Sequence, residues 1–125
     1  EANEGFRPSS EIKMHIRVFQ ERPDVNAVVH AHPMYATSFA IAGMGLTAKI
    51  MPEAVISLGE VPLTPYGTPS TMEIPDAISP YLQDYDSVLL ANHGALSYAG
   101  TLLDAYHKME SWNLCTVMYQ AECSE

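Results

Sequence analysis

The chain has few cysteines, few basic residues and no long apolar run. Its two cysteines, Cys115 and Cys123, would lie roughly 12 Å apart along the axis of one helix, too far for a disulfide. Six lysines and arginines against 15 acidic residues give a net charge of −9, which argues against nucleic acid and anionic membranes as partners. Without 18 consecutive apolar residues or a basic leader, we expect a cytoplasmic protein with reduced thiols and no targeting segment.

Apolar residues make up 47% of the 125 positions, which is enough for the core of one domain over residues 1–125. Helical and strand patterns alternate along the chain, and this alternation predicts an α/β fold with a parallel or mixed sheet. The expected helices cover residues 10–21, 34–42, 70–83 and 101–120, and the expected strands cover residues 27–32, 46–51, 60–63 and 87–91.

Apolar spacing also predicts which faces of two helices are buried. On the first helix the expected core stripe comprises Ile12, Ile16 and Phe19, with Met14 and Val18 beside it. On the last helix the expected core face comprises Leu102, Ala105, Met109, Trp112 and Tyr119.

The third expected helix carries local signals of its own. Ser70 and Glu73 have the spacing of a capping box, in which each side chain bonds the backbone N–H of the other. Pro75 falls in the first turn, where proline is tolerated, whereas Pro80 is expected to shorten or kink the helix.

Three histidines stand at the ends of two expected strands. His30 and His32 close the apolar run that begins at Ala27, and residues two apart in a strand point to the same side. His93 follows the run 87–91, and Gly94 after it allows a sharp turn. Two strand ends side by side would present three neutral imidazoles to one cation and leave a fourth position free, which is the pattern of a catalytic zinc site.

A purely structural interpretation competes with this metal site. A His-x-His pair is weak evidence by itself, and a lone histidine such as His93 is more often a polar residue that ends a strand. All three histidines nevertheless follow expected strands, and α/β proteins build their sites at the carboxyl ends of strands. His15 and His107 fall inside expected helices, and we interpret them as surface or core-edge residues rather than ligands.

Three short motifs resemble those of one family. Pro8-Ser9-Ser10-Glu11, the segment from Val28 to Pro33, and Asn92-His93-Gly94 are together similar to the class II aldolase/adducin family, and most similar to its L-fuculose-phosphate aldolases. The resemblance implies a three-layer α/β/α fold with a mostly antiparallel central sheet. It also implies a divalent metal, usually zinc, held by His30, His32 and His93, with Glu11 as the acid/base residue beside it.

The residues of the first motif also have ordinary structural roles. A carboxylate such as Glu11 is favoured in the first turn of a helix whatever the function, and Ser9 and Ser10 suit a helix cap. In the functional interpretation, a carboxylate beside a substrate held by a metal can take a proton from carbon. A helix N-terminus can also hold a phosphate, and the resemblance implies that the two serines contribute to the phosphate site of the substrate.

The activity implied by the resemblance is that of a zinc-dependent lyase. Such an enzyme cleaves a ketose 1-phosphate, for example L-fuculose 1-phosphate, into dihydroxyacetone phosphate and an aldehyde. Close alternatives on the same site are 4-epimerisation of a pentulose phosphate, dehydration and decarboxylation, and a non-catalytic module like the adducin heads is an alternative of another class. Adducin heads have lost the metal ligands, so three retained histidines count against that class. The family also implies a sugar phosphate as small-molecule partner and a homo-oligomer, most commonly a cyclic tetramer.

The chain departs from the family pattern in two places. Its first motif begins near residue 8, whereas relatives have a longer N-terminal portion that helps to build the phosphate-binding loop. We therefore expect residues 1–125 to be a domain that lacks its N-terminal part. Met51 stands where fuculose-phosphate aldolases have a tyrosine that donates a proton across a subunit boundary. Tyr35 and Tyr66 are the nearest tyrosines and match no motif, which leaves the proton donor and the exact substrate open.

Overall fold

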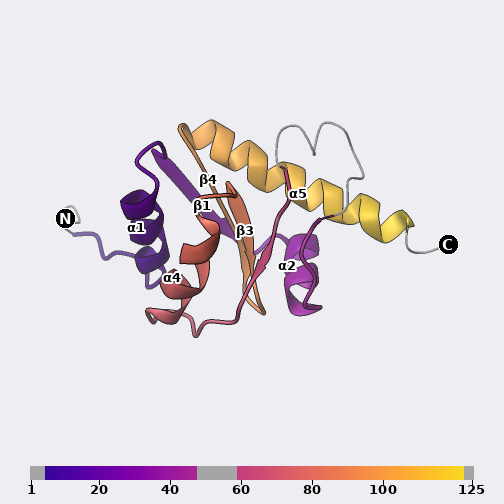
Figure 1. Ribbon diagram of the computed structural model, residues 1–125, viewed down its shortest axis with the longest axis horizontal. Coiled ribbons are helices and arrows are strands. Elements are labelled where there is room, and N and C mark those ends of the chain that lie inside the picture. Colours follow the sequence, from indigo (N-terminus) through magenta and orange to yellow (C-terminus); the bar gives the residue numbers. More distant parts are fainter. Residues whose placement is uncertain (1–4, 48–58, 123–125) are drawn as a thin grey trace.

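The computed structural model describes residues 5–47 and 59–122, with side chains up to residue 117. Its elements alternate between helices and strands (Figure 1). In chain order they are α1 (Ile12–Glu21), β1 (Ala27–Ala31), α2 (Met34–Ile41), β2 (Leu63–Thr64), α4 (Glu73–Ile78), the 3₁₀ helix η1 (Ser79–Tyr81), β3 (Ser87–Leu90), β4 (Gly94–Ala99) and α5 (Leu102–Glu122).

The four strands form one mixed sheet in the order β1-β4-β3-β2. β4 lies between β1 and β3 and is antiparallel to both, with Ala31 opposite Ala95 and Leu90 opposite Gly94. β2 pairs with β3 in parallel. The sheet is therefore mostly antiparallel, as the family resemblance implies, and β1 and β3 run in the same direction on either side of β4.

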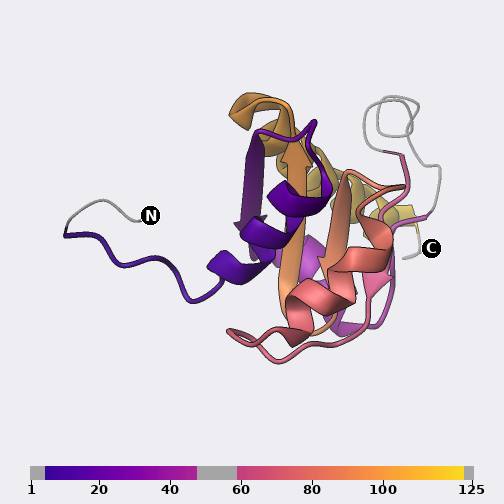
Figure 2. The ribbon, with the colours of Figure 1, turned by 60° about the vertical axis from the view of Figure 1, so that its left-hand side comes forward.

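Helices cover both faces of this sheet. In the two views α1 and α4 lie on one face, while α2 and α5 lie on the other (Figures 1 and 2). The result is a three-layer α/β/α arrangement, which confirms the expected fold class.

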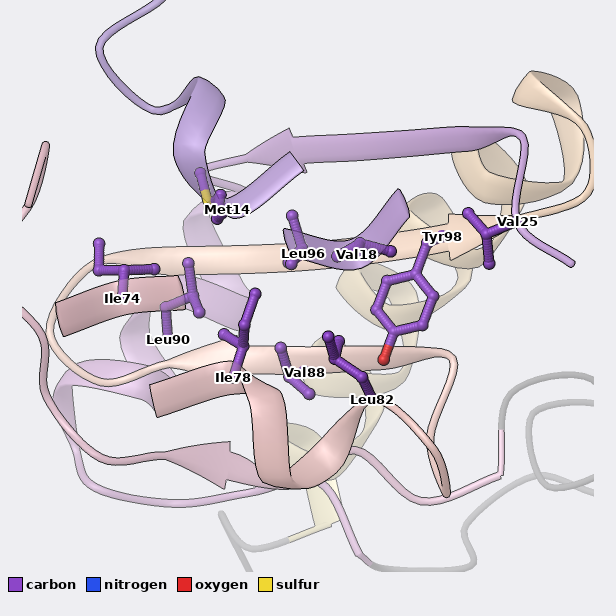
Figure 3. Close-up of a cluster of buried hydrophobic side chains, with 10 residues drawn as sticks. All are labelled: Met14, Val18, Val25, Ile74, Ile78, Leu82, Val88, Leu90, Leu96 and Tyr98. Atoms are coloured by element: carbon purple, nitrogen blue, oxygen red, sulfur yellow. The ribbon is translucent and has the colours of Figure 1, made fainter. Parts of the chain in front are cut away.

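The core between α1, α4 and the sheet is built from alternate residues of the strands. Val88 and Leu90 of β3 and Leu96 and Tyr98 of β4 point to this face, because side chains in a strand alternate between faces. Figure 3 shows them meeting side chains that come down from the helices. The complete cluster comprises Met14, Val18, Val25, Ile74, Ile78, Leu82, Val88, Leu90, Leu96 and Tyr98.

The intervening strand residues point to the opposite face. Leu89 and Ala95 pack there against α2 and α5, whose contributions include Phe39 and Trp112. Ser97 is also buried on this face, and its hydroxyl donates to the carbonyl of Ala105 at 2.7 Å. The sheet is therefore covered on both sides, which explains why β3 and β4 are buried along their whole length.

The buried face of α1 is not the one that apolar spacing predicted. Met14 and Val18 are 1% and 0% exposed, whereas Ile12, Ile16 and Phe19 are 38%, 46% and 45% exposed. The helix presents two apolar sides, and only the narrower one meets the sheet. Periodicity could not choose between them, because both have helical spacing.

The core face of α5 was predicted correctly at three positions and wrongly at one. Ala105, Met109 and Trp112 are buried, but Leu102 is 67% exposed. Leu102 is the first residue of the helix, where the chain has just left the sheet. The side chain of Tyr119 lies outside the described residues.

The predicted capping box is wrong. Ser70 lies outside the helix, and α4 begins at Glu73 after Met72. The Thr71 hydroxyl accepts the N–H of Glu73 at 3.1 Å, and the Glu73 carboxylate accepts the N–H of Thr68 at 2.8 Å. The same residue types therefore build a turn rather than a cap, while the 3₁₀ helix at Pro80 confirms the expected shortening.

Two strand predictions need correction. The expected strand 60–63 is replaced by β2, Leu63–Thr64, and Val61 instead forms an isolated antiparallel bridge with Leu46. Most of the expected strand 46–51 lies outside the described residues. Strand β4 was missed, since its small residues lack the β-branched signature of a strand.

Candidate metal centre

Three imidazoles converge at one edge of the sheet. His30, His32 and His93 each offer one ring nitrogen, and these three nitrogens lie within 4.8 Å of one another. The ring centroids are 4.9 to 5.0 Å apart, and the Nε2 atoms of His30 and His32 are separated by 3.2 Å. The structure therefore brings together the three histidines that the sequence singled out.

The arrangement of the strands explains this convergence. β1 and β3 are parallel to each other, so their carboxyl ends reach the same edge of the sheet, and His30 and His93 lie there. The two strands are not side by side as the sequence suggested, because β4 starts between them. Its first residue, Gly94, leaves space for the ring of His32, since a Cβ at that position would lie 2.5 Å from Cδ2 of His32.

The turn that aims His93 depends on Asn92 rather than on Gly94. Asn92 has a positive φ of 56°, a left-handed conformation in which asparagine is enriched among non-glycine residues. The N–H of His93 donates to the carbonyl of Leu90 at 3.0 Å, which closes the turn after β3. Gly94 already belongs to β4, so its role is close packing and not the sharp bend that the sequence predicted.

The backbone of β4 orients His30. Nδ1 of His30 lies 2.9 Å from the carbonyl oxygen of Ala95, and a carbonyl can only accept, so Nδ1 carries the proton. The Nε2 atom is then left with a free lone pair that faces His32. Such a bond from the second ring nitrogen fixes the tautomer of metal-binding histidines.

The electrostatic environment favours the neutral form of two of the rings. Burial lowers the pKa of His30 to about 4, although its bond to Ala95 opposes the shift and the nearby His93 and His32 add to it. Burial also lowers the pKa of His93, against the opposing charge of Glu11. Neutral imidazoles are the form that binds a metal.

The donor set fits a divalent cation such as zinc. Nδ1 of His93 is buried and has no hydrogen-bond partner among the described residues, which is unusual for a buried polar atom. Three nitrogen ligands with a further position open are typical of catalytic zinc sites. The three-histidine cluster could therefore hold a metal ion.

Glu11 lies at the start of α1. It is the N-cap residue of α1, half-buried, and its Oε1 accepts a hydrogen bond of 3.2 Å from the Ser70 hydroxyl. Its charge acts on both His93 and His15. The charge of Glu11 therefore reaches one histidine of the cluster, His93.

Ser9 and Ser10 are both exposed at the N-terminal end of α1. The Ser9 hydroxyl accepts the N–H of Glu11 at 3.2 Å, and its carbonyl accepts the N–H of Ile12. The N-cap of α1 is Glu11 and has no side-chain capping bond, so Ser9 closes a turn just before the helix and the expected capping role of the serines is wrong.

The other histidines and tyrosines occupy different positions. His15 is half-buried one turn after Glu11, and burial lowers its pKa while Glu11 opposes the shift. His107 is exposed on α5. Tyr35 is half-buried and Tyr66 is 57% exposed, while Met51 lies outside the described residues.

Sequence reasoning missed three contributors to this centre: the Ala95 carbonyl, the close packing at Gly94, and Ser70. A backbone carbonyl carries no signal in its residue type. Ser70 is 59 residues from Glu11 in the chain, so only the fold brings the two together. A glycine directly after His93 was the one visible signal, and it was interpreted as a bend.

A charged hollow lies at the other end of the sheet. It has a volume of about 470 Å³ and is lined by Arg22, Asp24, Asp86 and Lys108, among others. Its charges are largely paired with one another, since Asp86 accepts hydrogen bonds from both Arg22 and Lys108. We therefore interpret it as a structural ion-pair network.

Within residues 5–47 and 59–122, no helix combines the length and the apolar character that a membrane crossing needs.

Comparisons with known proteins agree with the motifs. The family model of the "Class II Aldolase and Adducin N-terminal domain" matches residues 1–119. The L-fuculose phosphate aldolase of Methanococcus vannielii is 36% identical over 104 residues, which cover 83% of this chain and 56% of that protein. The 5-deoxy-D-ribulose 1-phosphate aldolase of Bacillus thuringiensis serovar kurstaki is 37% identical over 120 residues, which cover 95% of this chain and 56% of that protein.

The fold has a similar counterpart among solved structures. An L-fuculose 1-phosphate aldolase superposes with a TM-score of 0.89 at 34% identity, covering 98% of this chain and 57% of the other. The chain therefore spans about half the length of the curated and solved relatives that it matches.

Proposed function

This chain belongs to the class II aldolase and adducin family, and from that premise we propose that it carries the active site of a zinc-dependent aldolase. The proposed substrate is a ketose 1-phosphate such as L-fuculose 1-phosphate. The products are dihydroxyacetone phosphate and an aldehyde. The observation that carries the proposal is the convergence of three imidazoles beside the carboxylate of Glu11.

His30, His32 and His93 are the proposed zinc ligands. A bound divalent cation polarises the carbonyl of a ketose and stabilises the negative charge that develops when the carbon–carbon bond breaks. The cluster is preorganised for this, because Ala95 holds the ring of His30 and the close approach of Gly94 sets the ring of His32.

Glu11 is the proposed acid/base residue. In the cleavage direction, the bond between C3 and C4 breaks, the hydroxyl on C4 loses its proton as the aldehyde forms, and C3 must gain a proton. Glu11 delivers that proton to the phosphate-bearing fragment, and in the reverse direction it removes it. Its place at a helix N-terminus beside the cluster suits a carboxylate that must be ionised for half of the cycle.

Ser9 and Ser10 are the proposed contacts of this chain to the substrate phosphate. Both are exposed where α1 begins, and a helix N-terminus attracts an anion. The group that accepts the C4 hydroxyl proton in the cleavage direction, and donates it in the reverse direction, is a separate question because Met51 stands where the resemblance implies a tyrosine. We propose Tyr66, which is exposed on the segment between β2 and α4. Its neighbours Pro65 and Gly67 line a small hollow together with His93.

Other reactions on the same centre remain alternatives. A 4-epimerase of pentulose phosphates uses the same carbon–carbon cleavage and re-forms the bond, and dehydration or decarboxylation start from the same polarised carbonyl. A non-catalytic module similar to the adducin heads is disfavoured, because such a module has no need of three converging imidazoles.

An exchange assay and a substrate panel test the function together. The intact protein with zinc should exchange the C3 proton of dihydroxyacetone phosphate with deuterated solvent. Glu11→Gln should retain zinc but lose about a hundred- to ten-thousandfold of that rate, while Glu60→Gln, an exposed carboxylate on the loop before β2, should exchange at the wild-type rate. Exchange at an undiminished rate in Glu11→Gln would remove Glu11 from the mechanism.

The panel identifies the reaction. Ketose 1-phosphates should release dihydroxyacetone phosphate in a coupled reductase assay, whereas a 4-epimerase would convert pentulose 5-phosphates without releasing a triose. Turnover of a non-phosphorylated acid alone, with no sugar phosphate accepted, would overturn the proposed substrate class.

A further inference from the structure

Ser70 has a backbone conformation that serine rarely adopts. Its φ is +67°, and in the described part of the chain Asn92 is the other non-glycine residue with a positive φ. This left-handed region is accessible to glycine at little cost and is strained for residues with a side chain. Such strain persists only where surrounding contacts fix it, and it is concentrated at functional sites.

The strained residue contacts α1 with two different groups. The hydroxyl of Ser70 donates to Oε1 of Glu11 at 3.2 Å, and the carbonyl of Ser70 accepts a hydrogen bond of 2.9 Å from Nζ of Lys13. Glu11 and Lys13 are both at the start of α1. Ser70 therefore bridges the turn before α4 to the beginning of the helix that carries the proposed acid/base residue.

The turn that holds Ser70 is fixed independently of Glu11. Thr68 donates its N–H to the Glu73 carboxylate, and the Thr71 hydroxyl donates to the Thr68 carbonyl at 2.7 Å. Gly67 packs so closely on the backbone of α4 that a Cβ there would lie 2.8 Å from the nitrogen of Ile74. The position of Ser70 is thus set by its own segment, and Glu11 meets a hydroxyl that is already in place.

From this geometry we propose that Ser70 is a positioning residue that holds the carboxylate of Glu11 toward the three-histidine cluster. The inference rests on the proposed function, since it assigns Ser70 a part in the work of Glu11. Among the described residues, Ser70 is the one side chain that donates a hydrogen bond to this carboxylate.

The physical effect is a choice of rotamer. A glutamate side chain at a helix end has several accessible conformations, and ordering it costs entropy. The bond to Oε1 selects one of them and leaves Oε2 to exchange a proton with the substrate. Positioning of this kind lowers the barrier of the reaction step and does not change how tightly the substrate binds.

Two substitutions at Ser70 separate this role from a structural one. Ser70→Gly removes both the hydroxyl and the strain, so its melting temperature should rise by about 2–8 °C, while kcat for proton exchange should fall about tenfold with KM unchanged. Ser70→Ala removes the hydroxyl and keeps the strain, so kcat should fall equally without a gain in melting temperature. If Ser70 only stabilised the fold, melting temperature and kcat would change in the same direction in each variant. An unchanged kcat in both Ser70→Gly and Ser70→Ala would overturn the proposal.

A double-mutant cycle in the metal-free intact protein tests the contact without any assay of activity. Melting temperatures of Ser70→Ala, Glu11→Ala and the double variant should be non-additive, because each single change already breaks the bond. Ser38→Ala combined with Glu11→Ala is the control and should be additive, since among the described residues the Ser38 hydroxyl donates to the carbonyl of Met34 within α2.

The outcomes distinguish the two proposals. Additive behaviour of Ser70 and Glu11 in a protein that exchanges the substrate proton would overturn the inference about Ser70 alone. A wild-type protein that shows no exchange would overturn the proposed function, and the catalytic role of Ser70 with it, whatever the result of the cycle.

Discussion

Gly94 and His32 are in direct contact across the edge of the sheet. A Cβ built on Gly94 would lie 2.5 Å from Cδ2 of His32 and 2.7 Å from the carbonyl oxygen of Ala31. Both distances are far shorter than a non-bonded carbon contact. The absence of a side chain at the first residue of β4 is therefore a condition for the position of His32 in the three-histidine cluster.

Gly94→Ala should accordingly disturb both the fold and the metal centre. The added methyl group must displace His32 or widen the pairing between β1 and β4, and overpacking of this kind costs about 1–3 kcal/mol. Urea unfolding should show that loss, and a zinc titration should show weaker binding. Gly100→Ala is the matched control, because a Cβ there has its nearest neighbour at 3.8 Å; if both variants were as stable and bound zinc as well as the wild type, the contact would have no consequence.

Removal of a ligand should abolish zinc binding at this centre. Loss of a hydrogen-bond partner of a metal ligand lowers metal affinity about 10–100-fold. His93→Ala removes a ligand itself, so its zinc affinity should fall by more than that. Elemental analysis after chelation and zinc readdition should give about one zinc per subunit for the wild type and none for the variant. His107→Ala, which changes an exposed histidine on α5, should retain the metal, and full occupancy in His93→Ala would show that the ligand assignment is wrong.

The ion pairs at the other end of the sheet should make stability depend on acid pH. Burial of Asp86 disfavours its charge, but the hydrogen bonds from Lys108 and Arg22 outweigh this effect, so its pKa is lowered in the folded protein. The hydrogen bond from Arg22 likewise lowers the pKa of Asp24 to about 2. A lowered pKa means that the folded state binds these protons less readily than the unfolded state, so the pairs stabilise above the ordinary carboxyl pKa and lose their effect as the pH falls through the folded value.

Asp86→Asn tests this dependence directly. Its deficit in the free energy of unfolding relative to wild type should be largest near neutral pH and should shrink between about pH 5 and pH 2. Urea unfolding at a series of pH values measures it. Asp84→Asn serves as the control, because Asp84 is exposed, and a deficit for Asp86→Asn that stayed constant with pH would mean that the charge of Asp86 contributes nothing.

Self-association is the expected state of the intact protein. Several large apolar side chains are exposed on two helices: Ile12, Ile16 and Phe19 on α1, and Leu102, Leu103 and Leu114 on α5. Patches of this kind mark interaction surfaces, and the family resemblance implies a homotetramer. Light scattering should give a mass of several subunits, and an active monomer would contradict the prediction.

Part of this structure could be predicted from short patterns because the physics behind them is local. The apolar runs before His30 and His93 indicated β1 and β3, and a two-residue spacing placed His30 and His32 on one side. The alternation of helical and strand patterns predicted an α/β fold, and the motifs singled out the three histidines that converge in the structure. Each of these features depends on residues that are close together in the chain.

Other features could not be predicted because they depend on contacts between distant residues. The face of α1 that is buried follows from where α4 and the sheet lie, and two apolar sides of one helix look alike until they are packed. Strand β4 could not be predicted, because the residues Gly94–Ala99 have little intrinsic preference for a strand. They form one because both of their faces are buried in the fold.

The sequence by itself determined which residues can bind a metal and that a carboxylate precedes them, because side-chain chemistry is a property of each residue. Only the tertiary structure decided that β4 enters between β1 and β3, that its Ala95 carbonyl holds His30, and that Ser70 reaches Glu11 across 59 positions. The reason is physical: a hydrogen bond acts over about 3 Å, and only the fold brings such distant segments within that range.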